Sequence, residues 1–405
     1  MNLSDKKAVV IGGGPGGLMA AEVLRAGGVA VTLYDRMPSV GRKLLIAGRG
    51  GLNLTHSEPL ERFVARYGAA APRLKAAIEA FPPAALIAWA QGLGQETFIG
   101  SSGRVFPKVM KASPLLRSWL QRLAAQGVVI KARHEWRGWD ASGDLIFSHG
   151  DEVVRDRADV VVLALGGASW AKLGSNGAWR EVMLARGVEV KPFRPSNSGF
   201  VINWSEAFRD RFEGEPLKGV ELSFSGRKVR GEALITRSGI EGGAVYALSA
   251  ALRDVIEVQG RAVLRVDLRP EMSESDLASR IERQRSDQSL ANALRKALTM
   301  PPVQVNLLRE SFGKDLANGA ALARQIKSVE IALTGVQPIE RAISSAGGVA
   351  FDAVDENFMI REMPGVYVVG EMLDWEAPTG GYLLQATFSS AVAAARDALR
   401  RLKSN

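Results

Sequence analysis

The segment that decides the fold lies near the start of the chain and reads Ala8-Val9-Val10-Ile11-Gly12-Gly13-Gly14-Pro15-Gly16-Gly17. Its apolar residues lead directly into the spacing Gly-x-Gly-x-x-Gly, which begins at Gly12. Apolar residues at helical spacing follow Gly17, and Gly27 and Gly28 end that pattern. The sequence therefore predicts a strand, a tight glycine turn and a helix with an open N-terminus. Such a turn lets backbone N–H groups approach a pyrophosphate.

A second predicted strand ends in an acidic residue at a distance that fits the same kind of turn. Apolar residues dominate positions 30–34, and Asp35 stands at their end. Asp35 follows Gly12 by 23 residues, near the roughly 20 residues expected for a carboxylate that binds a ribose hydroxyl. A lone Gly-x-Gly-x-x-Gly spacing fits an unrelated glycine-rich loop equally well. The preceding strand, the following helix and the acidic residue together favour a dinucleotide-binding fold.

The length and composition indicate a globular protein with more than one domain. The chain has 405 residues, too many for one compact core. It has no cysteine, which excludes disulfides, thiolate metal ligands and a cysteine nucleophile. The histidines, His56, His134 and His149, lack metal-ligand spacing, so we expect no metal site. The chain has no apolar run of membrane-spanning length, and its polar N-terminus leaves no room for a signal peptide. We therefore expect a cytoplasmic protein without a membrane partner.

The charge balance leaves two classes of partner open. The chain carries 52 Lys and Arg residues against 43 Asp and Glu residues, a formal net charge of +9. This excess permits a nucleic-acid or other anionic partner. The basic residues are spread along the chain, however, and no RRM, KH or zinc-finger signature is present. A basic enzyme with a small-molecule substrate is therefore favoured, and RNA remains the alternative partner.

The order of the predicted elements indicates an α/β nucleotide-binding domain that is interrupted by an insertion. Strands and helices alternate up to about residue 190, and a strand and a long helix return near the C-terminus. Between them the pattern changes to short apolar runs with turns and then to charged helices. We predict a discontinuous nucleotide-binding domain over 1–190 and 331–405, a β-rich, barrel-like inserted domain over 191–270 and a helical subdomain over 271–330.

Three glycine-rich sites fall at the ends of strands that we expect in one sheet. They are Gly12 to Gly17, Gly166-Gly167, and Gly370 together with Gly380-Gly381. Ligands of open α/β sheets bind beyond the carboxyl ends of the strands. A ligand that reaches all three sites must be long, so FAD fits better than NAD. The helix after Gly381 would direct its N-terminus at the flavin edge that becomes negative on reduction.

Ordered blocks of sequence carry a resemblance to a known family. They are GRKLLIAGRGGLNLT (41–55), GRVFP (103–107), ALGGASWAKLGS (164–175), EALITRSGIEGG (232–243), GEMLD (370–374) and TGGYLLQ (379–385). In these blocks the chain resembles the aminoacetone-oxidase-like family of bacterial flavoproteins, whose FAD domain is similar to that of glutathione reductase. The resemblance implies a glutathione-reductase-like, Rossmann-type FAD-binding domain. Many members have a cysteine where this chain has Leu52, which indicates a subgroup that lacks a thiol proton donor.

The resemblance also implies which residues contact FAD. The glycine turn would bind the phosphates, Asp35 the adenosine ribose, and the residues after Gly380 the flavin ring. Trp136 would flank the adenine. The full set comprises Gly12, Gly13, Gly14, Pro15, Gly16, Gly17, Asp35, Arg36, Arg42, Lys43, Leu44, Gly50, Asn53, Trp136, Ala164, Gly166, Gly167, Gly370, Glu371, Asp374, Gly380, Gly381, Tyr382, Leu383 and Leu384.

The activities of the family imply an FAD-dependent oxidoreductase. They include oxidation of small amino-ketones, reduction of steroid double bonds and reduction of a uridine in ribosomal RNA, all by hydride transfer at flavin N5. We expect a small organic substrate of the amine, ketone or enone class. RNA modification and flavin binding without turnover are the alternatives. A second glycine motif for a nicotinamide is missing, so either NAD(P)H binds transiently, or the substrate itself reduces FAD and oxygen reoxidises it. The candidates for proton transfer are Asn53, His56, Lys172, Glu371 and Tyr382.

Overall fold

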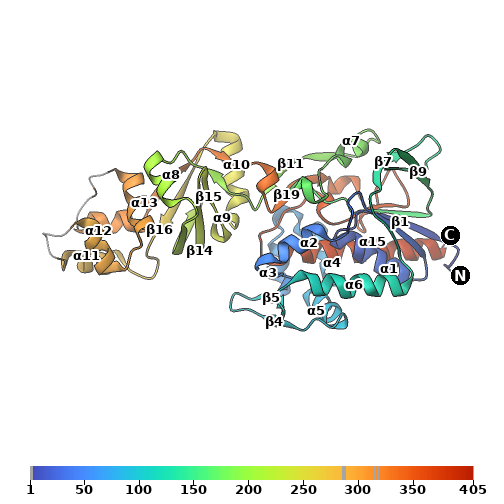
Figure 1. Ribbon diagram of the computed structural model, residues 1–405, viewed down its shortest axis with the longest axis horizontal. Coiled ribbons are helices and arrows are strands. Elements are labelled where there is room, and N and C mark those ends of the chain that lie inside the picture. The colour runs from blue at the N-terminus through green and yellow to red at the C-terminus, as the bar shows by residue number, and fades with distance from the viewer. Residues whose placement is uncertain (1–2, 285–288, 314–315, 317–318, 405) are drawn as a thin grey trace. The chain divides into compact units, whose positions relative to one another are not determined.

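The computed structural model describes residues 3–284, 289–313, 316 and 319–404 (Figure 1). The chain divides into two compact units. Unit 1 comprises Met1–Arg194 and Ile343–Asn405, and unit 2 comprises Pro195–Ala342. The unit boundaries therefore lie at 194/195 and 342/343, further along the chain than the predicted boundaries at 190 and 330. The second boundary moves furthest because strands after residue 330 still pair within the sheet of unit 2.

The core of unit 1 is a parallel sheet of five strands in the order β20-β10-β1-β2-β6. Its strands are β1 (Lys7–Ile11), β2 (Ala30–Tyr34), β6 (Val129–Lys131), β10 (Val160–Leu163) and β20 (Val366–Val368). Every neighbouring pair is parallel. The carboxyl ends of all five strands therefore lie along one edge, as the glycine pattern predicted.

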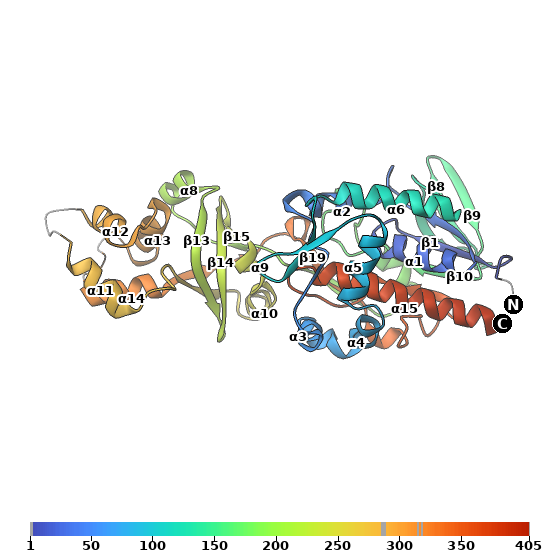
Figure 2. The ribbon, with the colours of Figure 1, turned by 90° about the horizontal axis from the view of Figure 1, so that it is seen from below.

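Both faces of this sheet are covered. Ala8 and Val10 of β1 pack into one hydrophobic cluster, and Val9 and Ile11 pack into another on the opposite face. The first cluster is covered by α1 (Pro15–Ala26), α5 (Pro83–Gly92), α6 (Ala112–Gln126) and α15 (Tyr382–Ser404). Figure 2 shows α1 and α15 side by side, which agrees with their many close contacts. Continuous apolar strands are typical of sheets buried on both faces.

Smaller elements complete unit 1 around this layer. An antiparallel sheet, β7-β8-β9, packs into the second cluster, and another, β3-β5-β4, follows the loop after α2. These and the remaining elements that matter for the site are α2 (Arg42–Ala47), β3 (Thr55–His56), α3 (Leu60–Ala65), α4 (Ala71–Ala80), β4 (Thr97–Ile99), β5 (Arg104–Pro107), β7 (Glu135–Trp139), β8 (Leu145–His149), β9 (Glu152–Asp156), α7 (Trp179–Leu184), β11 (Val190–Ser196) and β19 (Ser344–Val349).

Unit 2 is built on an antiparallel sheet of seven strands in the order β17-β16-β13-β14-β15-β12-β18. Only Thr334 separates β17 from β18 in the chain, so the two ends of the strand order are joined through one bent segment. The sheet therefore curls into the barrel-like arrangement that we predicted. Its strands are β12 (Phe200–Val201), β13 (Pro216–Phe224), β14 (Arg227–Thr236), β15 (Gly239–Glu241), β16 (Ala262–Asp267), β17 (Val329–Leu333) and β18 (Gly335–Val336).

Helices cover the sheet of unit 2 and share one hydrophobic cluster with it. They are α8 (Glu206–Phe212), α9 (Gly243–Tyr246), α10 (Ser249–Gln259), α11 (Glu274–Glu282), α12 (Leu290–Leu298), α13 (Pro302–Phe312) and α14 (Gly319–Lys327). Figure 2 shows α11 to α14 gathered on one side of the sheet, in the region predicted as the helical subdomain. Parts of that prediction, at 285–288, 314–315 and 317–318, lie outside the described residues.

Candidate functional site

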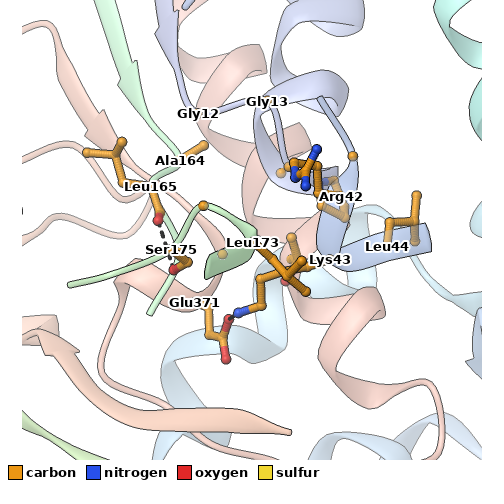
Figure 3. A pocket seen from close by; sticks show the side chains of 18 of the residues that line it. Gly12, Gly13, Arg42, Lys43, Leu44, Ala164, Leu165, Leu173, Ser175 and Glu371 are labelled. Carbon is orange, nitrogen blue, oxygen red and sulfur yellow. Dashed lines mark hydrogen bonds and ion pairs between the residues drawn. The ribbon is translucent and has the colours of Figure 1, made fainter. Parts of the chain in front are cut away.

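A cavity of about 790 Å³ lies in unit 1, beyond the carboxyl ends of β1, β10 and β20. Segments from distant parts of the chain form its wall (Figure 3). They are the turn between β1 and α1, the residues after β2, helix α2, strand β7, the loop after β10, and the turn before α15. The cavity is long enough to touch all three glycine-rich sites, which the sequence placed at one edge of the sheet.

The turn between β1 and α1 leaves a helix N-terminus open to the cavity. Gly14 is the N-cap of α1, with no side-chain hydrogen bond to the helix, and Pro15 follows it. A Cβ atom built on Gly14 meets no atom within 4 Å, whereas one built on Gly17 lies 1.8 Å from the carbonyl oxygen of Gly12. Gly17 thus allows helix and strand to pack closely, and Gly14 faces space that a pyrophosphate can enter.

Asp35 stands beside this turn at the end of β2. Its carboxylate accepts hydrogen bonds from the backbone N–H of Gly13 at 2.6 Å and of Met37 at 2.7 Å. Burial raises the pKa of Asp35, and those two hydrogen bonds oppose the rise. Each carboxylate oxygen keeps a lone pair for another donor. A ribose hydroxyl in the cavity is a donor of the right kind.

Three buried polar atoms on the cavity wall lack a hydrogen-bond partner within the described part of the chain. They are Nε of Arg42, Oδ1 of Asn53 and Nε1 of Trp136. Buried polar atoms are nearly always paired in folded proteins. These three include two donors and one acceptor, so they fit a long ligand that carries both kinds of group, as FAD does.

An ion pair also lines the cavity. Nζ of Lys43, on α2, lies 3.4 Å from a carboxylate oxygen of Glu371, which follows β20. Nζ also donates to Oγ of Ser169 at 3.1 Å, and the other oxygen of Glu371 accepts from the N–H of Ser345 at 3.0 Å. Figure 3 shows the side chains of Lys43 and Glu371 pointing toward each other. The pair joins elements from opposite ends of the chain.

The turn before α15 closes the other end of the cavity. Gly380 and Gly381 have φ values of 135° and 96°, which favour glycine. A Cβ atom on Gly381 would lie 2.4 Å from Cα of Thr55, so this turn packs directly against β3. Leu383 and Leu384 of the first turn of α15 line the cavity, whereas the ring of Tyr382 points elsewhere, to Glu58.

The structure brings most of the expected cofactor residues to the wall of this cavity. Those that line it are Gly12, Gly13, Gly14, Pro15, Gly16, Asp35, Arg36, Arg42, Lys43, Leu44, Asn53, Trp136, Ala164, Gly166, Gly370, Glu371, Gly380, Gly381, Leu383 and Leu384. Five expected residues do not line it: Gly17, Gly50, Gly167, Asp374 and Tyr382. Among the candidates for proton transfer, Asn53 and Glu371 line the cavity, and His56, Lys172 and Tyr382 do not.

The residues away from the wall have identifiable local surroundings. A Cβ atom on Gly167 would lie 2.5 Å from Oγ of Ser345, so this glycine permits close packing behind the cavity. Burial raises the pKa of Asp374, whose carboxylate accepts a backbone hydrogen bond from Gly347. Lys172 is exposed to solvent. Position in a sequence motif did not indicate that these residues lie away from the cavity wall.

Arg36 lines the cavity and also makes a contact that its place beside Asp35 did not indicate. Its guanidinium donates to the carbonyl oxygens of Gly174 at 2.6 Å and Ala171 at 2.9 Å. These bonds hold the segment around residues 171–174. Sequence reasoning did not predict that residues of this segment line the cavity. Trp170, Leu173 and Ser175 all line the cavity. They lie in the block 164–175 that carried the resemblance, which was the available signal.

Strand β7 and its surroundings supply further lining residues that sequence reasoning missed. His134, Glu135 and Arg137 flank Trp136 on the cavity wall, and Tyr34 lies beside them. The rings of Tyr34 and His134 meet edge to face with centroids 5.4 Å apart. Strand alternation alone does not predict this set, because it depends on how the small sheet packs on the large one.

A parallel sheet with an uncapped glycine turn, an acidic residue at the end of the second strand and a cavity along its carboxyl edge defines a dinucleotide-binding fold. Comparison with known families then places the chain. Residues 6–397 match the HI0933-like protein Rossmann domain, and the chain belongs to this family. Together with the fit of the cavity, this makes FAD the cofactor of the site and the protein a member of a family of FAD-dependent oxidoreductases.

Two curated relatives align along nearly the whole chain at low sequence identity. A 3-dehydro-bile acid delta(4,6)-reductase from Clostridium scindens is 26% identical and covers 97% of this chain and 98% of its own length. A ribosomal RNA dihydrouridine synthase from Haemophilus influenzae is 24% identical over 97% of this chain and 98% of its own. Neither of these two relatives is named an aminoacetone oxidase, so the expected resemblance is supported at the level of the wider family.

A solved structure shares the fold along nearly the whole chain. It is a 3-ketosteroid delta1-dehydrogenase from Sterolibacterium denitrificans, in complex with 1,4-androstadiene-3,17-dione. It covers 98% of this chain and 100% of its own, with a TM-score of 0.54 and 12% sequence identity. At this identity the likeness concerns the fold. Within the described residues, no helix combines the length and apolar character needed to cross a bilayer.

Proposed function

We propose that this protein transfers a hydride between FAD and a small apolar substrate with a carbon–carbon double bond conjugated to a carbonyl group. The names of two comparison proteins, a bile acid reductase and a ketosteroid dehydrogenase, support this substrate class. The fit of the cavity to FAD supports the cofactor requirement.

The observation that carries the proposal is the Lys43–Glu371 pair within a largely apolar wall. Side chains of Leu44, Leu52 and Leu383 line the same cavity as the pair. An apolar wall suits a ring or chain of hydrocarbon, and the ammonium group of Lys43 suits one substrate oxygen atom. Glu371 and Ser169 hold the ammonium group in place, so it does not need to reorganise when a substrate oxygen arrives.

The protein needs to supply only a proton donor and a site that orients the substrate. Reduction of such a double bond adds a hydride to one carbon and a proton to its neighbour, and the reverse reaction removes both. FAD, when bound, supplies or accepts the hydride. Lys43 Nζ carries an exchangeable proton at the cavity wall and attracts the carbonyl oxygen, where negative charge grows during the reaction. The apolar side chains orient the substrate and exclude water.

Anaerobic reduction of the FAD-loaded protein tests the proposal. Reduced nicotinamides and candidate amines are added separately, followed by a 3-keto-4-ene steroid, and the flavin absorbance is recorded. We expect NADH or NADPH to reduce the flavin and the steroid to reoxidise it. Reduction by amines, with reoxidation by oxygen alone, would show an amine oxidase. A flavin that no compound reduces would show a binding protein without turnover.

The variant Lys43→Met tests the role of the ion pair. We expect reoxidation by the steroid to slow by roughly 100-fold, within the range for loss of a general acid. The control is Lys75→Met on α4, which removes a lysine from an exposed pair with Glu79. Stopped-flow absorbance measures both rates, and equal rates in the two variants would remove Lys43 from the mechanism.

RNA is the second candidate substrate, because one relative is named a ribosomal RNA dihydrouridine synthase and the net charge is +9. Contacts to phosphates are strongest at low salt. Titration of the protein with ribosomal RNA fragments at low and at physiological salt therefore tests this alternative. Negligible binding at low salt would eliminate it, whereas tight binding with a steep salt dependence would favour it over the steroid-like substrate.

A further inference from the structure

The start of α15 is attached to a cluster of polar side chains that lies behind the cavity. The hydroxyl of Tyr382, the first residue of α15, donates to the carboxylate of Glu58 at 2.5 Å. The guanidinium of Arg66 donates to both oxygens of Glu58, at 3.0 and 2.7 Å. Glu58 is the centre of the cluster, and its side chain is only 10% exposed.

His56 binds the backbone of the residue that carries this carboxylate. Its Nδ1 accepts from the backbone N–H of Glu58 at 3.1 Å, so Nε2 carries the proton and donates to the carbonyl oxygen of Ser102 at 2.9 Å. The imidazole stacks on the ring of Tyr382, with centroids 5.5 Å apart and planes 18° apart. His56 therefore fixes both the loop that carries Glu58 and the face of the tyrosine ring.

The ring of Tyr382 in turn supports the glycine turn at the end of the cavity. A Cβ atom on Gly380 would lie 2.9 Å from Cε2 of Tyr382, so the ring packs directly against the turn. The hydroxyl of Tyr67 donates to the carbonyl oxygen of Tyr382 at 2.7 Å. The next residues, Leu383 and Leu384, line the cavity. Movement of the Tyr382 ring would therefore move the cavity wall.

We propose that Glu58 and Tyr382 are positioning residues that hold the first turn of α15 in a fixed orientation toward the flavin end of the site. This inference rests on FAD being the cofactor. The N–H groups at a helix N-terminus stabilise negative charge only when they point at it. A turn that is free to move would stabilise reduced flavin less, and FAD would become harder to reduce.

Tyr382→Phe removes one oxygen atom and leaves the ring in place. We expect the equilibrium constant for flavin reduction to fall by a factor of roughly 3 to 10, the effect of weakening an interaction at a helix terminus. Glu58→Ala should have a similar effect, and the double variant should not add to it. Glu58→Gln should restore much of the loss, because its amide oxygen still accepts from Tyr382.

The matched control is Tyr367→Phe. The hydroxyl of Tyr367 on β20 donates to the carboxylate of Asp397 on α15 at 2.8 Å, so the same bond type is lost at a pair that does not line the cavity. Equilibrium redox titration of the FAD-loaded proteins measures the reduction constant, and thermal unfolding compares their stability. A general structural effect would lower the melting temperature in both variants and leave the reduction constants equal.

Two outcomes separate this inference from the proposed function. If the unaltered protein binds no FAD, the cofactor assignment fails and the positioning role fails with it. If it binds FAD and reduces the steroid, but Tyr382→Phe and Tyr367→Phe have the same reduction constant, the proposed function stands and the positioning role is overturned. A selective change in Tyr382→Phe that Glu58→Ala reproduces supports it.

Discussion

At the scale of single residues, glycines of one motif perform different tasks. Gly17 is needed for packing, since its Cα faces the carbonyl oxygen of Gly12 with no room for a side chain. Gly14 has room and an ordinary backbone, with φ −80° and ψ −178°. Its lack of a side chain leaves open space at the helix N-terminus, where we propose that a phosphate of the cofactor approaches. The motif would then combine a folding requirement with a binding requirement, and substitution can separate the two.

Gly14→Ala should leave the fold intact and weaken cofactor binding. The new methyl group enters the cavity where a phosphate would approach the helix N-terminus. We expect FAD to dissociate at least about tenfold more readily, or about 1.4 kcal/mol, with unfolding free energy within about 0.5 kcal/mol of the original. Flavin fluorescence titration and denaturant unfolding measure the two quantities.

Gly17→Ala provides the contrast. Its methyl group would overlap a backbone oxygen, and overpacking of this kind costs roughly 1–3 kcal/mol of stability. The apoprotein should therefore unfold at lower denaturant concentration. Equal stability of the two alanine variants would contradict the division of tasks.

The carboxyl of Glu58 makes stability depend on pH. Burial alone would raise its pKa, but the hydrogen bonds from Arg66 and Tyr382 outweigh burial and hold the pKa below the ordinary value of 4.5. A lowered pKa in the folded state stabilises the fold above the unfolded-state pKa, and this contribution disappears as the pH falls through the folded-state pKa. Glu58→Gln has no carboxyl to protonate at this position. As the pH is lowered from 7 to 3, its denaturant midpoint should therefore fall less steeply below pH 4.5 than that of the unaltered protein. Parallel curves for the two proteins would contradict this.

At the scale of elements, one buried carboxylate holds three helices together. Glu22 of α1 accepts from Nε1 of Trp119 on α6 at 2.6 Å, from Nε1 of Trp89 on α5 at 3.1 Å, and from Arg122 at 3.0 Å. The dinucleotide-binding helix is thereby fixed to the helices that cover the same face of the sheet. Burial of a carboxylate is costly unless it is hydrogen-bonded, and these three donors offset that cost for Glu22.

Glu22→Ala should be strongly destabilising. It leaves two indole N–H groups and a guanidinium without their acceptor, and breaking a buried charged network costs about 3–5 kcal/mol. Glu22→Gln keeps the shape and one acceptor and should cost about 1–3 kcal/mol. Glu79→Ala, at an exposed pair on α4, is the control and should stay within about 0.5 kcal/mol. Urea unfolding of the apoproteins measures all three.

The sequence predicted elements well where their pattern is local. The strand, glycine turn and helix at residues 7–26 follow from apolar spacing and glycine geometry, and the structure confirms them. The barrel-like closure through Thr334 was expected only in outline, because it depends on long-range pairing of β17 and β18. The place where the insertion ends depended on the same pairing, which explains the shift of the boundary from 330 to 342.

The sequence located the candidate site but not the direction of its side chains. Motif spacing put Arg36 and Tyr382 at the right segments of chain. Their side chains donate hydrogen bonds to Gly174 and Glu58, which are distant in sequence, so motif spacing could not indicate these partners. Lys43 was expected as a cofactor contact, and its pairing with Glu371 joins residues 328 positions apart. No local pattern encodes such a pairing.

At the scale of the whole molecule, each unit has its own core. The clusters of unit 1 draw on both of its chain segments, and the cluster of unit 2 lies within the insertion. The cavity lies in unit 1. The cofactor should therefore stabilise one unit more than the other.

Calorimetry tests this difference. At a free FAD concentration 100 times its dissociation constant, binding adds about 2.7 kcal/mol, which raises the melting temperature of unit 1 by about 5–10 °C. We expect two transitions, of which one moves with FAD. Limited proteolysis after heating between them identifies the unit that has unfolded. A single transition, or two that move together, would show that the units unfold as one.

The Lys43–Glu371 pair has a consequence for biosynthesis. The cavity needs residues from Ile11 to Thr387, and its central ion pair joins a lysine made early with a glutamate made almost last. A nascent chain on the ribosome carries the phosphate-binding turn long before it has the partner that completes the wall. We therefore expect the chain to retain FAD only after the insertion and the segment that carries Glu371 have been translated. A message truncated within the insertion should yield a chain that does not retain FAD.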